Sequence, residues 1–161
     1  MSSQVILRSA TRTDIPAIFD LIKALAEYEK LSHTVTGDPL TLENHLFGQP
    51  SYAEVILADL GGKVVGFALF FYNYSTFLTK PGIHLEDLFV LPEYRGQGIG
   101  KSLITYLAKL VVERGCGRLE WTVLDWNESA IAFYKGMGAD VLPDWRICRV
   151  TGESLVSLAS R

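Results

Sequence analysis

Apolar and polar residues follow two different periods along this chain, and each period predicts one kind of element. From Ile15 to Leu25 the apolar residues recur every three or four positions, which is typical of a helix with one buried face. Shorter apolar runs predict strands, and Gly61-Gly62 between two such runs predicts a two-residue hairpin. The predicted helices are one capped by Thr13 and ending at Glu29, then 40–47, 99–113 and 127–135; the predicted strands are 5–9, 54–59, 63–72, 83–91, 118–124 and 145–151.

The order of these elements predicts the fold class. The sequence β-α-α-β-β-β-α-β-α-β describes an α/β protein in which helices cover both faces of one sheet. A chain of 161 residues with 48% hydrophobic content is long enough to bury one core. Because no linker interrupts the pattern, we expect residues 1–161 to form a single domain.

Composition and charge exclude several kinds of partner. The net charge is −3, and no basic stripe is interleaved with aromatic residues, so we expect no nucleic-acid partner. No apolar stretch is long enough to span a membrane, and Met1 to Arg12 carries no signal-peptide pattern, so we expect a cytoplasmic protein. His33, His45 and His84 lack metal-ligand spacing, so no metal is predicted and these histidines are interpreted as structural or surface residues.

The segment from Arg95 to Ser102 is the strongest candidate for a binding site. Three glycines within five positions at the start of a predicted helix allow backbone N–H groups to converge on an anion, which predicts a diphosphate-bearing cofactor. The nucleoside-triphosphate loop would need glycine at Arg95, and the dinucleotide fingerprint would need it at Lys101 or Leu103. The segment instead matches [QR]-x-x-G-x-[GA]. On the loop alone, a glycine-rich turn without a ligand stays open.

This loop and the order of elements resemble the Gcn5-related N-acetyltransferases. Within that family the chain is most similar to the diamine (spermidine/spermine) N-acetyltransferases, through the segments 26–29, 85–90, 94–100, 126–128 and 133–135. The resemblance implies a mixed, mostly antiparallel sheet, acetyl-CoA as cosubstrate and a homodimer. The cofactor-binding residues it implies are Leu88, Phe89, Val90, Arg95, Gly96, Gln97, Gly98, Ile99, Gly100, Lys101, Asn127, Ala130 and Tyr134.

Acetyl transfer to an amine needs a group that removes a proton from the ammonium. An alkyl amine has a pKa near 10.4, so most of it is protonated at neutral pH. Glu86 and Asp87 lie side by side in an apolar strand, where alternation predicts that they face opposite sides. Glu86 is the predicted base, because the matching glutamate of the similar enzymes relays the proton through water. An acid pair that only forms ordinary ion pairs is the alternative.

The resemblance also implies how the thioester is handled. In this fold the strand before the phosphate loop carries a bulge that frees main-chain groups for the carbonyl, which maps onto Leu88 to Val90. Tyr134 is the predicted acid for the leaving thiolate. Asn127 can cap its helix, and positions 127, 130, 131 and 134 share one face. A packed core tyrosine is the alternative.

The acceptor is less closely defined by the sequence than the cofactor. The residues implied to bind it are Tyr28, Glu29, Glu86, Asp87, Asp144 and Trp145. The segment between Gly138 and Trp145 is shorter than in the similar enzymes, so polyamines, other diamines and lysine-like amino acids such as thialysine all stay open. A protein or peptide acetyltransferase and a non-catalytic acyl-CoA sensor are the alternatives. Residues 153–159 are interpreted either as a dimer contact or as a short packing helix.

Overall fold

The structure is a computed structural model that describes residues 4–161. The first three residues of the segment considered for a signal peptide therefore lie outside the described part. Contacts group the chain into two units, one ending at Thr122 and the other spanning Val123–Arg161, and each unit is described by itself.

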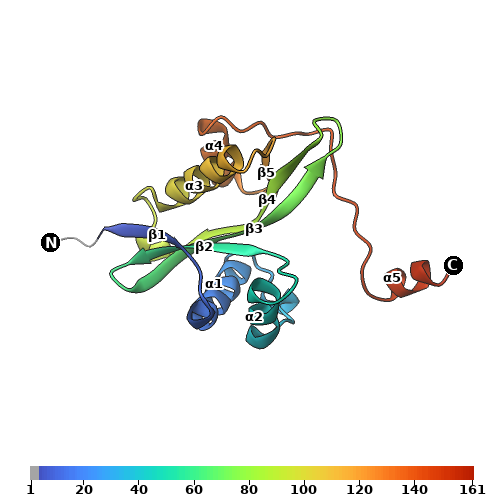
Figure 1. Cartoon of the computed structure of the whole chain (residues 1–161), viewed down its shortest axis with the longest axis horizontal. Coiled ribbons are helices and arrows are strands. Elements are labelled where there is room, and N and C mark those ends of the chain that lie inside the picture. Colours follow the sequence, from blue (N-terminus) through green and yellow to red (C-terminus); the bar gives the residue numbers. More distant parts are fainter. Residues whose placement is uncertain (1–3) are drawn as a thin grey trace. The chain divides into compact units, whose positions relative to one another are not determined.

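The first unit is built on one five-stranded sheet (Figure 1). Its strands are β1 (Val5–Ser9), β2 (Glu54–Leu60), β3 (Lys63–Ser75), β4 (Lys80–Val90) and β5 (Leu119–Trp121), in that order across the sheet. Neighbours from β1 to β4 are antiparallel, and β5 runs parallel to β4. The predicted mixed, mostly antiparallel sheet is therefore confirmed, and so is the hairpin at Gly61-Gly62, where both glycines have positive φ.

Helices cover both faces of this sheet, as predicted. Figure 1 shows α1 (Ile15–Tyr28) and α2 (Pro39–Phe47) on one face and α3 (Ile99–Glu113) on the other. Ile18 and Leu21 of α1 pack in one buried cluster with Phe67 of β3 and Phe89 of β4. The stripe of apolar residues that α3 presents is buried as well, with Leu103 fully excluded from solvent. Burial of these two amphipathic faces holds the layers together.

The entry into α1 differs from the prediction that Thr13 caps the helix. A short 3-10 turn, Arg12–Asp14, comes first, and the Asp14 carboxylate accepts a hydrogen bond of 2.7 Å from the Thr11 N–H. The Arg8 guanidinium donates to both oxygens of the same carboxylate, at 2.8 and 2.9 Å. These bonds lower the pKa of Asp14 to about 2. Asp14, not Thr13, therefore directly precedes α1, and its side chain caps no N–H group of that helix.

Strand β4 contains a bulge, at a different place from the one expected. Leu69 lies opposite Asp87 and Phe70 lies opposite Leu85, so Glu86 is an extra residue in β4. Leu88, Phe89 and Val90 pair regularly with β3, which contradicts a bulge at those three positions. On its other edge, however, β4 pairs with β5 only from Ile83 to Leu85. Beyond Leu85 no strand of the described chain covers this edge of β4.

The second unit contains two short helices, α4 (Glu128–Gly136) and α5 (Gly152–Ala159). The predicted helix at 127–135 is confirmed, whereas the predicted strand at 145–151 is wrong. That segment has no regular structure, and among the described residues 146–150 form no backbone hydrogen bond. Trp145 and Ile147 are exposed. A strand exists only with a hydrogen-bonded neighbour, which an alternating sequence cannot supply alone.

Candidate active site

Three carboxyl groups gather where α1 ends beside the bulge of β4. Asp87 lies opposite Leu69 and two residues before Phe89, both part of the apolar core beneath α1, whereas Leu85 lies outside that core. Because Glu86 is the extra residue between them, it shares the α1 side of the sheet with Asp87. The expectation that the two acids face opposite sides is therefore wrong, since the bulge interrupts the alternation on which it rested.

The pKa of Asp87 shows the effect of the two neighbouring acids. Burial, together with the negative charges of Glu86 and Glu29, raises the pKa of Asp87 to about 7. Burial also raises the pKa of Glu29, which follows directly after the last residue of α1. Within residues 4–161 no cation pairs with Asp87 and no donor hydrogen-bonds to it. The cluster therefore holds one carboxyl that exchanges its proton near neutral pH.

His84 lies beside this cluster. Its Nε2 lies 3.6 Å from an oxygen of Glu86, and its ring packs on Phe71 with centroids 5.0 Å apart. The sequence signal was available, because residues two positions apart in a strand share a face. His84 is therefore a neighbour of Glu86, the more exposed of the two adjacent acids.

Arg95 connects the end of α1 with the glycine loop. Its Nε donates to the Val90 carbonyl at 2.9 Å. The guanidinium carbon lies 4.7 Å from the ring centroid of Tyr28 and 5.2 Å from that of Phe89. Such stacking is attractive and leaves the guanidinium partly hydrated. Arg95 thus fixes the start of the loop against the end of α1, where Tyr28 is 40% exposed.

The loop has the backbone of an anion site. Gly96 and Gly98 have φ values of 79° and 81°, the left-handed region that favours glycine. Helix α3 begins directly after Gly98. In the described chain, no backbone carbonyl accepts from the N–H groups of residues 98–101. These donors and the positive end of α3 suit a diphosphate. The residues present therefore fit the predicted cosubstrate.

The second unit carries the remaining predicted cofactor and acceptor residues. Asn127 caps α4, and its side-chain oxygen accepts from the Ala130 N–H at 3.3 Å and from the Ser129 hydroxyl at 3.2 Å. Tyr134 is half-buried on α4, with its ring 5.5 Å from that of Phe133. Asp144 and Trp145 are exposed in the irregular segment. The roles of all these residues stay predictions, as does the single domain.

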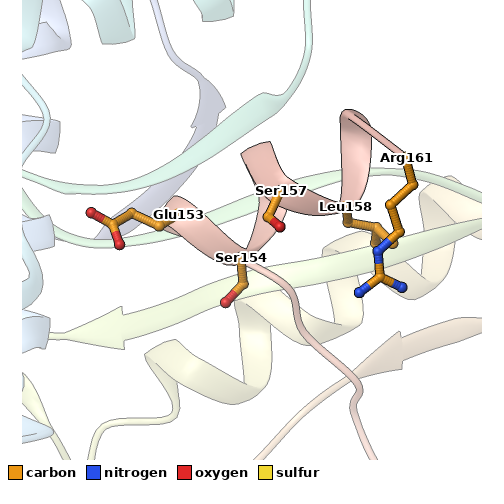
Figure 2. A pocket seen from close by; sticks show the side chains of 5 residues that line it. All are labelled: Glu153, Ser154, Ser157, Leu158 and Arg161. Atoms are coloured by element: carbon orange, nitrogen blue, oxygen red, sulfur yellow. The ribbon is translucent and has the colours of Figure 1, made fainter.

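A hollow on α5 offers no catalytic arrangement. Figure 2 shows its lining side chains, which all come from α5 and the chain end: Glu153, Ser154, Ser157, Leu158 and Arg161. Over residues 4–161 no group of three His, Cys, Asp or Glu side chains is arranged to hold a metal ion. In the same part of the chain, every helix is too short or too polar to cross a membrane. The cytoplasmic location stays a prediction.

Comparison with known proteins identifies the class of enzyme. The sequence pattern described as the acetyltransferase (GNAT) family matches residues 18–139. The thialysine N-epsilon-acetyltransferase of Bos taurus is 38% identical, over 98% of this chain and 98% of its own length. The L-ornithine N5-acetyltransferase NATA1 of Arabidopsis thaliana is 37% identical, over 94% of this chain and 86% of its own. The integron cassette protein VCH_CASS6 from V. cholerae has a similar structure, with a TM-score of 0.82 at 28% identity, covering 100% of this chain and 99% of that one.

The chain is therefore an acetyltransferase of the GNAT family. This confirms the resemblance drawn from the loop and the order of elements. The fold class is confirmed with it. The acceptor and the roles of individual residues are not decided by family membership.

Proposed function

We propose that the protein transfers an acetyl group from acetyl-CoA to a primary amine of a small cationic substrate. The observation that carries this proposal is the cluster of Glu29, Glu86 and Asp87 at the end of α1, where Arg95, the first residue of the glycine loop, stacks on Tyr28. An ammonium group is attracted to such a cluster, and the exposed Tyr28 ring beside it adds a favourable face for a cation.

Acetyl-CoA would bind through the loop and the open edge of β4. The N–H groups of residues 98–101 would hold the diphosphate, and Lys101, exposed in the first turn of α3, would add positive charge. Leu88 to Val90 would offer main-chain groups on the edge that β5 leaves uncovered. Asn127, Ala130 and Tyr134 of α4 are the other proposed contacts. When bound, the cosubstrate supplies the acetyl thioester.

The reaction would proceed by direct attack of the amine. The acidic cluster binds the ammonium and takes its proton, and the freed amine attacks the thioester carbonyl. Tyr134 would protonate the departing sulfur, because a phenol with a pKa near 10 can donate to a thiolate when the two are held in contact. No step requires a covalent acetyl-enzyme.

The acceptors that fit best are diamines and amino acids with a side-chain amine. Two relatives bear the names of thialysine and L-ornithine acetyltransferases, and both compounds carry a terminal primary amine on a short chain. Polyamines share that group. Asp144 and Trp145 are proposed to contact the far end of the acceptor. Which of these compounds reacts depends on that far end.

A panel of acceptors tests this proposal. Thiol release from acetyl-CoA is measured with thialysine, ornithine, lysine, putrescine, spermidine, spermine and a basic peptide, and the products are identified by mass spectrometry. Saturable turnover on a small amine, with the peptide inert, is the expected result. Turnover on the peptide alone would replace the proposal with a protein acetyltransferase. Tight acetyl-CoA binding without any turnover would favour the sensor.

We also propose that the protein is a homodimer. Leu155, Val156 and Leu158 of α5 are all at least half exposed, and so are Trp145 and Ile147. Apolar side chains gathered on one segment are typical of an interface between subunits. Light scattering coupled to size-exclusion chromatography would give twice the chain mass for a dimer and the chain mass itself for a monomer.

A further inference from the structure

We propose that Asp87, and not Glu86, removes the proton from the acceptor ammonium, while Glu86, the more exposed acid, binds that ammonium. This inference rests on the proposed function, and it departs from the sequence-based choice of Glu86 as base. It divides two adjacent acids into a binding carboxylate and a catalytic one.

The bulge is the first support for this division. Because Glu86 is the extra residue of β4, the two carboxyl groups emerge on the same side of the sheet, next to the end of α1. Asp87 lies deeper, between Leu69 and Phe89, whereas the Glu86 side chain is 55% exposed. One ammonium entering from solvent therefore meets Glu86 first and Asp87 second.

The partners of the two acids differ as well. Glu86 contacts His84, whose ring is held by Phe71. Over the described residues Asp87 has neither an ion pair nor a hydrogen bond, so its oxygens are available to a substrate. The charged groups that act on Asp87 are Glu86 on β4 and Glu29 at the end of α1. Nearby, His84 lies beside Glu86, and Arg95 is stacked on the rings of Tyr28 and Phe89.

These surroundings make Asp87 an unusually strong base for a carboxylate. Burial and the two neighbouring acids raise its pKa to about 7. Proton transfer from an amine of pKa near 10.4 is then uphill by about three pKa units, compared with more than six for an ordinary aspartate. General-base catalysis is most effective when the pKa of the base lies near the working pH. Glu86 and Glu29 thus raise the pKa of Asp87 but do not themselves accept the proton.

The proton and electron balance of the step is simple. The Asp87 carboxylate takes one proton from R–NH3⁺, which leaves R–NH2 with its lone pair. That lone pair forms the C–N bond to the thioester carbonyl, and the C–S bond then breaks with its electrons on sulfur. Sulfur takes a proton, and the nitrogen loses its second proton to water. Asp87 returns its proton to solvent, so one proton is released per turnover.

The pH dependence of kcat/KM for the amine distinguishes the two acids. For the wild type we expect kcat/KM to rise with pH through about 7, as Asp87 ionises. Asp87→Asn should lose this limb and at least ~100-fold of the rate. Glu86→Gln should keep the limb but move it to lower pH, because a negative charge that raises the pKa of Asp87 is removed. It should also raise KM.

A second variant keeps the test independent of changes in the strand. Glu29→Gln alters only the end of α1 and should also move the limb to lower pH. Loss of the limb in Glu86→Gln, with the limb kept in Asp87→Asn, would overturn the inference. If Glu29→Gln does not shift the rising limb to lower pH, that result would also count against the inference. If the wild type acetylates no amine of the panel, the proposed function fails instead, which is a different outcome.

Discussion

Replacing Asp87 by asparagine is expected to stabilise the folded protein, and increasingly so at higher pH. The folded state raises the pKa of this carboxyl from 3.8 to about 7. A pKa difference of one between the folded and unfolded states corresponds to about 1.4 kcal/mol, so the ionised form opposes folding by about 4 kcal/mol at alkaline pH. The asparagine side chain carries no charge at any pH and so avoids this cost.

The direction of the pH dependence follows from proton binding. Between pH 3.8 and about 7 the folded wild type keeps a proton on Asp87 that the unfolded chain has lost. Stability from this group therefore falls as pH rises through that window and is constant above it. Against the wild type, Asp87→Asn should gain about 1.5 kcal/mol at pH 5 and about 4 kcal/mol at pH 8.5.

Urea unfolding at these two pH values measures the difference. Asp20→Asn is a matched control, because the Asp20 side chain is 80% exposed on α1, and its effect should stay within about 0.5 kcal/mol at both pH values. The reasoning is refuted if the stability difference between Asp87→Asn and the wild type does not grow with pH. A gain in stability together with a loss of turnover would indicate that Asp87 serves catalysis at the expense of stability.

Three further predictions concern other parts of the chain. Gly98→Ala should weaken acetyl-CoA binding ~10-fold by calorimetry, because φ is 81° there, whereas Gly37→Ala, with open space and no such φ, should not; equal affinities would contradict the anion site. Asp14→Asn should cost about 2 kcal/mol at pH 7, since the pKa near 2 gives stability that is lost as pH falls from 3.8 towards 2. Urea unfolding that gives the same loss at pH 7 and pH 3 would argue against this. Tyr134→Phe should lower kcat at least ~100-fold with little change in acetyl-CoA affinity, and unchanged turnover would remove it as the acid.

The sequence predicted best those elements whose signal lies within the element itself. The apolar spacing from Ile99 to Glu113 gave the bounds of α3, and the glycine pair gave the β2–β3 hairpin. The glycine loop was predicted with its correct place at the start of α3, because φ values and N–H directions are set locally.

Features that depend on a neighbouring strand were not predictable in this way. The bulge at Glu86 depends on how β4 aligns with β3, and no residue type in β4 indicates an extra position. Plain alternation, applied without this bulge, gave the wrong faces for Glu86 and Asp87. The strand expected at 145–151 failed for a related reason, since alternation predicts which face could be buried but not whether a neighbour exists.

The most direct test of the central claim measures acceptor kinetics and acetyl-CoA affinity in variants of the acidic cluster. kcat/KM for the best small amine and Kd for acetyl-CoA are measured for the wild type and for Glu29→Gln, Glu86→Gln and Asp87→Asn. If the cluster is the acceptor site, each variant should lose at least ~10-fold in kcat/KM while Kd stays within about twofold. Unchanged kcat/KM in all three variants would place the acceptor elsewhere and contradict the claim.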